Sequence, residues 1–550
     1  MGLKRTLLRP VAFVAGRHAR RQYNAFLAAH RRTAEVQERF LLRLLRMHEE
    51  TEFGRKHGFA KIRSVDDFRK AVPINEYDSL KPYVDKVLQG RTTALLPADQ
   101  PPLMFSMTSG TTGSPKYIPV TERFATEMRR GWNIWGRAAF DQHKEAWLRP
   151  LLQVTSRMRE ENSPTGLPCG AVSGLLSLRQ KRVVRRMYAA PAQAALIDDH
   201  ESRYYTIMRC AIPRDVSFIT TANPSTTIKL IDIANRHADR LVEDIATGQL
   251  RPPSPLPAEV REQFRFRPNK PLAERLRSAL RNEGRLLPRH FWNLAFLGNW
   301  TGGTLWLYQP RLRELFGDVP VRDIGLLASE GRFTIPMEAN SPGGIAEITG
   351  NFLEFIPAGN HGQASALTVT AEQTEVGQEY FLVFSNYTGL WRYNLDDRVR
   401  VVDRFGGSPV LEFLCRGKNT ANMTGEKLTE RQVVEAMARA CPEASIFSLQ
   451  GRFAQTPHYL LRIGGSDRHK AEALAQALDD ELARQNVEYA SKRESGRLGP
   501  VQVQLEQPGT LEREEQDLIR TRRGRAEQYK HQYLLTDVIN EACDASQVRE

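Results

Sequence analysis

The residues with the clearest chemical potential form a short loop between Thr108 and Lys116, which reads TSGTTGSPK. Two glycines allow the backbone to turn tightly, so that its amide groups form a concave site for an anion. The hydroxyls add hydrogen-bond donors, and the lysine adds a point charge suited to a polyphosphate. The pattern indicates phosphate binding, and the alternative is a polar hairpin turn that binds nothing. The residues assigned to this site are Ser109, Gly110, Thr111, Thr112, Gly113 and Lys116.

Several other catalytic and cofactor motifs are absent from the sequence. The loop is not a Walker loop, because no GK[ST] follows the required four-residue gap. No GxSxG, HExxH or GxGxxG pattern occurs. The five cysteines show neither CxxC nor Cys/His ligand spacing, so a disulfide framework and a structural zinc site are not expected. A reducing cytoplasm fits this cysteine content best.

The size and composition of the chain predict a globular protein of several structural units. It has 550 residues, of which 41% are apolar and 26% are charged. These values exclude a disordered, collagenous or coiled-coil chain. At roughly 150 residues per domain, the length predicts three or four units. No window approaches 18 uninterrupted apolar residues, so no transmembrane helix is expected.

The chain is basic, and its charge is concentrated at one end. The 78 Lys and Arg exceed the 64 Asp and Glu, and residues 1–34 contain eight of the basic residues and no acid. A solvated helix face is the favoured interpretation of this segment, and weak membrane-surface contact is the alternative. No nucleic-acid partner is expected, because aromatic residues do not interleave the arginines. His18 and His30 are predicted to lie at the surface.

Apolar periodicity predicts alternating strands and helices. Short apolar runs predict strands at 103–107, 117–120, 216–220, 293–297 and 321–327, and amphipathic stretches predict helices at 23–53, from 122 onward, at 228–245 and at 305–316. Such alternation is typical of an α/β architecture with largely parallel sheets. Residues 379–415 predict antiparallel hairpins. The residues after 417 predict a compact α+β domain that ends in a helical region.

The loop also resembles the phosphate-binding signature of the adenylate-forming superfamily. Its extension TSGTTGSPKYIPVT is similar to that of the acyl acid amido synthetases, which are known as the auxin-responsive family in plants and have bacterial relatives. Counterparts of further family motifs occur in the family's order: LLASE at 326–330, YNLDD at 393–397, CRGKNTANMTGEKLTE at 415–430 and AEQYK at 526–530. With VPINEYDSLKPYV at 72–84 and LGPVQVQLEQPGT at 498–510, the resemblance covers nearly the whole chain after about residue 35.

The resemblance implies an ATP-dependent, AMP-forming ligase that uses Mg²⁺. Such an enzyme adenylates a carboxylic acid, releases pyrophosphate and transfers the acyl group to an amine, expected here to be an amino acid. One alternative is a thioester-forming ligase, although Asn419 stands where the hinge of those ligases usually has Asp. The other is a non-catalytic basic binding protein on the same fold. The expected partners are the two small-molecule substrates, and the expected state is a cytoplasmic monomer or weak oligomer.

The resemblance also implies roles for individual residues. Glu330 is a hard oxygen ligand suited to Mg²⁺ beside the phosphates of ATP, and Asp397 corresponds to the residue that binds the ribose hydroxyls. Lys427 and Lys530 correspond to lysines that supply charge near the α-phosphate. With Glu330 they are the predicted catalytic residues. The remaining predicted nucleotide-binding residues are Gly302, Gly303 and Ser329, and the acyl pocket is predicted around Phe218, Thr221 and Phe333.

Three residues depart from the family pattern. Leu326 stands where an aromatic residue is usual, so the two glycines that follow Thr301 are expected to let the backbone approach the base. Asp396 replaces the family's glycine. Asn394 replaces its arginine, for which Arg392 could compensate. Asp397 follows Asp396 directly, and its alternative role is an ion pair with the flanking Arg392 and Arg398.

Together these patterns predict an α/β protein with a large N-terminal domain and a small α+β C-terminal domain. In the large domain, mixed β-sheets are flanked by helices and completed by a β-rich closing subdomain. The expected boundaries are a basic segment at 1–34, a large ATP- and acyl-binding domain at 35–416, a hinge at 417–427 and a small mobile domain at 428–550. Rotation about the hinge is expected to exchange the two half-reactions.

Overall fold

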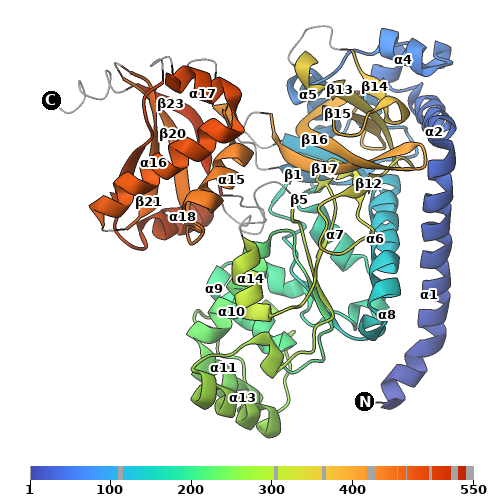
Figure 1. Ribbon diagram of the computed structural model, residues 1–550. Coiled ribbons are helices and arrows are strands. Elements are labelled where there is room, and N and C mark those ends of the chain that lie inside the picture. Colours follow the sequence, from blue (N-terminus) through green and yellow to red (C-terminus); the bar gives the residue numbers. More distant parts are fainter. Residues whose placement is uncertain are drawn as a thin grey trace. The chain divides into compact units, whose positions relative to one another are not determined.

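A computed structural model gives the fold of the chain (Figure 1). It describes residues 2–108, 116–302, 308–361, 367–417, 420–421, 426, 428–454, 456–465, 467–494, 498–521 and 531–540. The chain divides into two compact units. The first comprises residues 1–302, 310–395 and 399–413, and the second comprises residues 303–309, 396–398 and 414–550.

Two long helices of the first unit, α1 (Gly2–Ala29) and α6 (Glu122–Gln142), lie side by side (Figure 1). The Thr121 hydroxyl caps α6 by accepting a hydrogen bond from the Phe124 amide at 3.2 Å. Of the apolar residues that recur on one face of α6, Phe124, Met128 and Trp135 are buried and Trp132 is half-buried. On the other side, Asn133 Nδ2 donates to Gln22 Oε1 of α1 at 2.9 Å. Helix α6 therefore connects the basic N-terminal helix to the core.

Shorter helices surround the sheets of the first unit. Up to residue 316 they are α2 (Thr33–His48), α3 (Glu52–Lys56), α4 (Val65–Ala71), α5 (Tyr77–Leu88), α7 (Val172–Leu178), α8 (Arg182–Arg185), α9 (His200–Ala211), α10 (Pro224–Arg236), α11 (Ala238–Thr247), α12 (Ala258–Arg261), α13 (Lys270–Glu283) and α14 (Gln309–Phe316). Only the four-residue α12 interrupts the proline-rich stretch between α11 and α13. Prolines lack the amide donor that a longer helix needs.

A four-stranded parallel sheet confirms the predicted α/β pattern. Its order is β3-β6-β7-β8, and every pair in it is parallel. The strands are β3 (Leu151–Gln153), β6 (Phe218–Thr220), β7 (Phe296–Asn299) and β8 (Val321–Asp323). Strand β7 begins three residues later than the apolar run predicts, and β8 ends four residues earlier. Helices separate these strands along the chain, as parallel connections require.

A second sheet brackets the glycine-rich loop. Its order is β2-β1-β5-β4, and β1 pairs with β2 so that Thr108 lies opposite Lys116. The strands are β1 (Pro102–Thr108), β2 (Lys116–Thr121), β4 (Glu161–Asn162) and β5 (Pro168–Gly170). The antiparallel ladder therefore brings the two ends of the loop together.

A seven-stranded sheet contains the predicted strand-rich region. Its order is β11-β12-β17-β16-β15-β13-β14, and a separate hairpin of β9 and β10 precedes it along the chain. The strands are β9 (Leu327–Ala328), β10 (Gly331–Arg332), β11 (Thr334–Ile335), β12 (Gly344–Ala346), β13 (Asn351–Pro357), β14 (Val369–Thr370), β15 (Glu379–Asn386), β16 (Tyr393–Phe405) and β17 (Ser408–Arg416). The main apolar core includes buried residues of α2, α5, β1, β13 and β15.

The prediction that His30 lies at the surface is wrong. His30 is fully buried, and its Nδ1 forms a 2.8 Å hydrogen bond with Ser408 Oγ. Burial lowers the pKa of His30 to about 4. The partner lies 378 residues away in the sequence, so local pattern gives no sign of it. His18 is exposed, as predicted.

The second unit is a small α+β domain, as the sequence predicts. Its main sheet has the order β22-β21-β20-β23. Its elements are β18 (Thr420–Ala421), β19 (Leu428–Thr429), α15 (Glu430–Ala440), β20 (Phe447–Phe453), β21 (His458–Gly464), α16 (Arg468–Gln485), α17 (Val487–Glu494), β22 (Gln502–Glu506), α18 (Thr510–Thr521) and β23 (Leu534–Asn540). The prediction that the chain ends in a helical region misses β23, which pairs in parallel with β20.

Candidate active site

Glu330 lies in the two-residue turn of the hairpin that joins β9 and β10, with Ser329 as its neighbour. Ser329 is half-buried, whereas Glu330 is only 4% exposed. Removing a carboxylate from water is unfavourable unless polar or charged groups surround it. Glu330 is therefore not an ordinary surface carboxylate.

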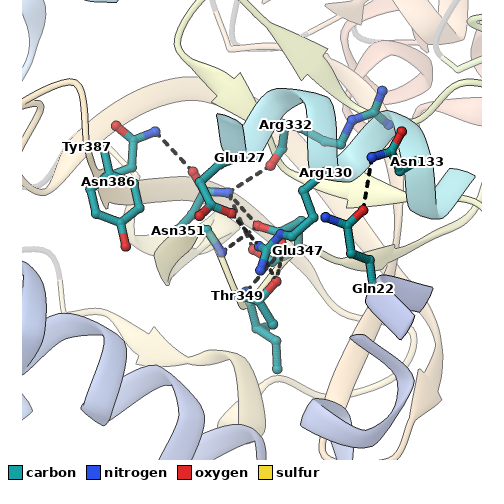
Figure 2. Close-up of polar contacts among 12 residues, drawn as sticks. Gln22, Glu127, Arg130, Asn133, Arg332, Glu347, Thr349, Asn351, Asn386 and Tyr387 are labelled. Carbon is teal, nitrogen blue, oxygen red and sulfur yellow. Dashed lines mark hydrogen bonds and ion pairs between the residues drawn. The ribbon is translucent and has the colours of Figure 1, made fainter. Parts of the chain in front are cut away.

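Two asparagines of the seven-stranded sheet hold this hairpin (Figure 2). Asn386 Nδ2 donates to the carbonyl oxygen of Glu330 at 2.9 Å and to Asn351 Oδ1 at 3.0 Å. Asn351 Nδ2 donates to the carbonyl oxygen of Arg332 at 2.7 Å. Because Asn351 and Asn386 face each other in the β13–β15 ladder, the sheet register fixes both amides. The backbone is thus anchored at Glu330 and two residues beyond it.

A group of buried and half-buried charges joins α6 to the same asparagines (Figure 2). Glu347 accepts a hydrogen bond from the Gly350 amide at 2.8 Å and pairs with Arg130 at 3.1 Å. Arg130 also pairs with Glu127 at 2.8 Å. Burial raises the pKa of the Glu127 carboxyl, and the charge of Arg130 opposes this effect. These charges therefore connect the asparagines that hold the hairpin to α6.

Tyr77, at the start of α5, contacts the strand that follows the glycine-rich loop. The Nζ atom of Lys116 lies 5.3 Å from the centre of the Tyr77 ring, and the Tyr117 amide donates to the Tyr77 hydroxyl at 2.7 Å. Burial raises the pKa of Tyr77 to about 12, and the carboxylate of Glu330 is among the charges that add to this effect. The structure therefore places Lys116, which ends the loop, against Tyr77.

The third motif lies on β16, where buried and half-buried residues alternate. Asp397 occupies a buried position of this strand and is 3% exposed. Asp396 has φ of 62°, in the left-handed region that favours glycine. This backbone explains why a glycine suits the position. Arg392 binds Glu354 through Nε at 2.9 Å and Nη2 at 3.1 Å, so its guanidinium is committed to that carboxylate.

The three residues predicted around the acyl group are all buried in the first unit. Phe218 stacks on Phe296 with ring centres 4.6 Å apart, and Phe333 lies 4.8 Å from Phe384. Thr221 Oγ1 donates to the Asn223 carbonyl at 2.7 Å. Thr221 directly follows β6, at the carboxyl end of this parallel strand, where open α/β sheets commonly bind ligands, whereas Phe218 is the first residue of β6.

Gly302 is buried beside two aromatic residues. A Cβ atom added to it would lie 3.0 Å from Trp300 Nε1 and 3.4 Å from Phe413 Cβ. A larger residue would therefore displace one of these rings. The other predicted site residues lie outside the described residues: Ser109, Gly110, Thr111, Thr112, Gly113, Gly303, Lys427 and Lys530.

The sequence gives no role to Tyr77 or Asn386. Tyr77 falls within the segment VPINEYDSLKPYV, whose likeness to the family is the only signal that marks it. Asn386 lies at the end of an apolar strand, where a polar residue is ordinary. Its importance comes from its partners Glu330 and Asn351 and is visible only in three dimensions.

The buried carboxylate of Glu330 has the chemistry to hold Mg²⁺. This ion usually takes one or two protein carboxylates, with phosphates and water as its other ligands. Within the described part of the chain, no three His, Cys, Asp or Glu side chains gather as a metal site. The donor set thus fits an ion that arrives with a polyphosphate and takes few protein ligands.

None of the helices among the described residues combines the length and the apolar character that crossing a membrane requires.

The chain is similar to proteins of one known family. Family models match the GH3 family N-terminal domain at residues 22–321, its central domain at 345–416 and its C-terminal domain at 431–538. Indole-3-acetic acid-amido synthetase GH3.10 of Arabidopsis thaliana is 24% identical over 527 residues, covering 87% of this chain and 88% of the relative. Jasmonoyl--L-amino acid synthetase JAR6 of Nicotiana attenuata is 22% identical, and 87% of each chain is covered.

Solved structures agree with these matches. The GH3.15 acyl acid amido synthetase superposes with a TM-score of 0.81 at 18% identity, and 94% of each chain is covered. This value shows that the two chains share a fold. The three family models together span more than half of the sequence. The chain therefore belongs to the GH3 family.

Proposed function

We propose that this protein is an ATP-dependent, AMP-forming ligase that joins a carboxylic acid to an amino acid. In the first step a carboxylate oxygen attacks the α-phosphorus of ATP, and pyrophosphate leaves as the new P–O bond forms. In the second step the amine attacks the acyl carbon, the C–O bond to AMP breaks, and the nitrogen loses a proton. Two steps are needed because a free carboxylate is a poor electrophile, whereas AMP is a good leaving group.

The observation that carries this proposal is the burial of Glu330, a carboxylate without an ordinary surface role, in a chain that also has a phosphate-type loop. Lys116 ends that loop and lies over the Tyr77 ring, and Glu330 is 4% exposed. A lysine, a phosphate-type loop and a buried carboxylate suit Mg-ATP. Magnesium would neutralise charge on the phosphates, and Glu330 would hold it in position.

The other predicted residues take the roles that the family likeness implies. The loop residues Ser109 to Gly113 bind phosphate oxygens through their amides and hydroxyls, and Asp397 binds the ribose hydroxyls. Lys427 and Lys530 stabilise the charge that develops at the α-phosphate. Gly302 and Gly303 let the backbone approach the base. Rotation of the small domain about residues 417–427 exchanges the two half-reactions.

The substrates are a small carboxylic acid and an amino acid, as the names of the relatives suggest. The acyl group lies around Phe218, which begins β6, Thr221, which follows it, and Phe333. The cysteine content favours a cytoplasmic location, and we expect a monomer or weak oligomer.

Product analysis tests the proposal. The purified chain is incubated with Mg-ATP, a panel of aromatic, fatty and hydroxy acids, and either amino acids or coenzyme A. We expect AMP, pyrophosphate and an amide, detected by mass spectrometry. A thioester as the sole acyl product would favour the alternative ligase. Steeply salt-dependent RNA binding without nucleotide turnover would favour the non-catalytic alternative.

A further inference from the structure

Arg332, two residues after Glu330, is a buried cation held in one position. It is 3% exposed, and its guanidinium lies over the ring of Trp132 at 4.5 Å. Its stem packs on α6 so closely that a Cβ at Gly131 would lie 2.4 Å from Arg332 Cδ. One terminal nitrogen, Nη1, donates to the carbonyl oxygen of Ile324 at 2.8 Å. Packing and this hydrogen bond fix the orientation of the guanidinium.

The other edge of this guanidinium has no protein partner. Neither Nε nor Nη2 of Arg332 makes a hydrogen bond, and no carboxylate of the described residues lies within 4 Å of them. In Figure 2 the guanidinium ends apart from the dashed contacts, which reach only the carbonyl oxygen of this residue. The Nε and Nη2 groups point in the same direction, as the two parallel donors that bind a carboxylate do.

The nearby carboxylates are occupied by other donors. Glu347 accepts from the Gly350 amide and pairs with Arg130. Asp323 accepts from the amide and hydroxyl of Thr301, each at 2.6 Å. Arg332 therefore has no counter-ion in contact with it among the described residues.

An uncompensated buried charge is strongly unfavourable in a folded protein. Proteins keep such an unfavourable group at a binding site, where the bound ligand supplies the missing opposite charge. The surroundings of Arg332 are aromatic. Its guanidinium lies over Trp132, which is partly exposed and contacts Trp135.

We propose that the free edge of Arg332 binds a carboxylate of the acyl substrate, against a wall formed by Trp132 and Trp135. This inference rests on the proposed function and names a residue that selects its substrate. The carboxylate has two possible sources: the group that is adenylated, or a second carboxylate on a dicarboxylic acid. Both sources need the same two-donor recognition, and matched acids separate them.

Two substitutions of Arg332 test the proposal. Arg332→Met keeps the packed stem and removes the charge, whereas Arg332→Lys keeps a charge and removes the two-donor edge. Arg313→Met, at an exposed residue of α14, is the control. Hexanoate and benzoate are compared with adipate and terephthalate. Affinity is measured by thermal shift without ATP, and the KM for each acid by exchange of labelled pyrophosphate into ATP.

We expect both variants to raise the KM for acid at least about tenfold, since hydrogen bonds to charged groups are strong. The melting temperature of Arg332→Met should equal or exceed that of the wild type, because the variant removes an uncompensated charge. If the KM rises only for adipate and terephthalate, Arg332 binds a second carboxylate. If the KM rises for all four acids, Arg332 binds the carboxylate that is adenylated.

An unchanged KM and an unchanged acid-induced thermal shift in both variants would overturn the proposal. A fall in melting temperature with unchanged acid affinity would mark Arg332 as a structural residue, and it would also overturn it. A wild-type chain that shows no acid-dependent exchange counts against the proposed function. In that case the thermal shifts still decide whether Arg332 binds carboxylates.

Discussion

Arg392 and Arg332 are both buried arginines next to strands of the seven-stranded sheet, yet their surroundings differ. Arg392 binds Glu354 through Nε and Nη2, and its Nη1 donates to the Val72 carbonyl at 2.8 Å. Arg332 makes one hydrogen bond and has no carboxylate within 4 Å among the described residues. Burial alone thus does not separate a structural arginine from a binding residue. The number of guanidinium N–H groups that already have protein acceptors does separate them, because a group whose donors are all paired cannot also bind a ligand.

The Arg392→Met substitution has the largest expected effect and tests whether Arg392 is a structural residue. Glu354 would keep Arg69 at 3.0 Å but lose its two-point partner, leaving buried charge partly uncompensated. We expect the free energy of unfolding to fall by about 3–5 kcal/mol, measured by urea denaturation. The control is Arg400→Met, which removes a half-exposed pair with Glu379 at 2.7 Å. It should lose less than about 1 kcal/mol, and equal losses in the two variants would contradict the comparison.

The Glu330→Gln substitution extends the comparison to carboxylates. Glu354 contacts two arginines, whereas we propose that Glu330 holds a metal ion. We expect acid-dependent pyrophosphate exchange to fall about 100-fold, the scale of a lost preorganised electrostatic group. Stability should change by less than about 1 kcal/mol, since the amide keeps the shape of the side chain. Glu338→Gln, at an exposed residue, is the control, and full exchange activity in Glu330→Gln would remove this residue from the mechanism.

His30 tests whether a buried titratable group without a counter-ion makes the fold sensitive to acid. Its pKa is about 4 in the folded chain, whereas an unperturbed histidine has a pKa of 6.5. The unfolded chain therefore binds more protons between these values, and stability is lost as the pH falls through that window. At pH 5 the loss attributable to His30 is about 2 kcal/mol relative to pH 7. Urea denaturation of His30→Gln should show a pH dependence smaller by this amount.

The exposed His18 is the matched control for that experiment. His18→Gln should leave the difference in stability between pH 7 and pH 5 as it is in the wild type. A pH dependence unaltered in His30→Gln would show that other groups cause the acid sensitivity.

Asp396 offers the smallest and most local test. Its φ of 62° is strained for a residue with a Cβ atom, so Asp396→Gly should stabilise the fold by up to about 1 kcal/mol. Asp403→Gly, at an exposed position of the same strand outside the left-handed region, should destabilise it by about 0.5–1 kcal/mol. Opposite signs in the two melting curves support the backbone explanation, and a shared sign would refute it.

Local pattern predicts much of the fold. The apolar residues at helical spacing in α6 and the short apolar runs of the parallel sheet predict their elements correctly, because helix and strand periods are local properties of the sequence. Strand β23 is different, since it becomes a strand by pairing with β20, more than 80 residues earlier in the chain. His30 fails for the same reason: its burial depends on Ser408.

The site is predictable to a smaller extent. Motif order marks Glu330, Asp397 and Lys116, and the structure buries both carboxylates and places Lys116 over the Tyr77 ring. The roles of Asn386 and Arg332 depend on hydrogen bonds that are made or missing in three dimensions, and the spacing of residues in the sequence does not encode them. The roles of Glu330, Asp397, Lys116, Lys427 and Lys530 stay predictions.

The most direct test of the central claim is exchange of labelled pyrophosphate into ATP by the purified full-length chain. Adenylation is reversible, so exchange should require Mg²⁺ and a free carboxylic acid together. It should vanish when the carboxamide of the same compound replaces the acid. Exchange that proceeds equally without any acid, or that no acid supports although ATP binds, would contradict the claim that this chain activates carboxylates.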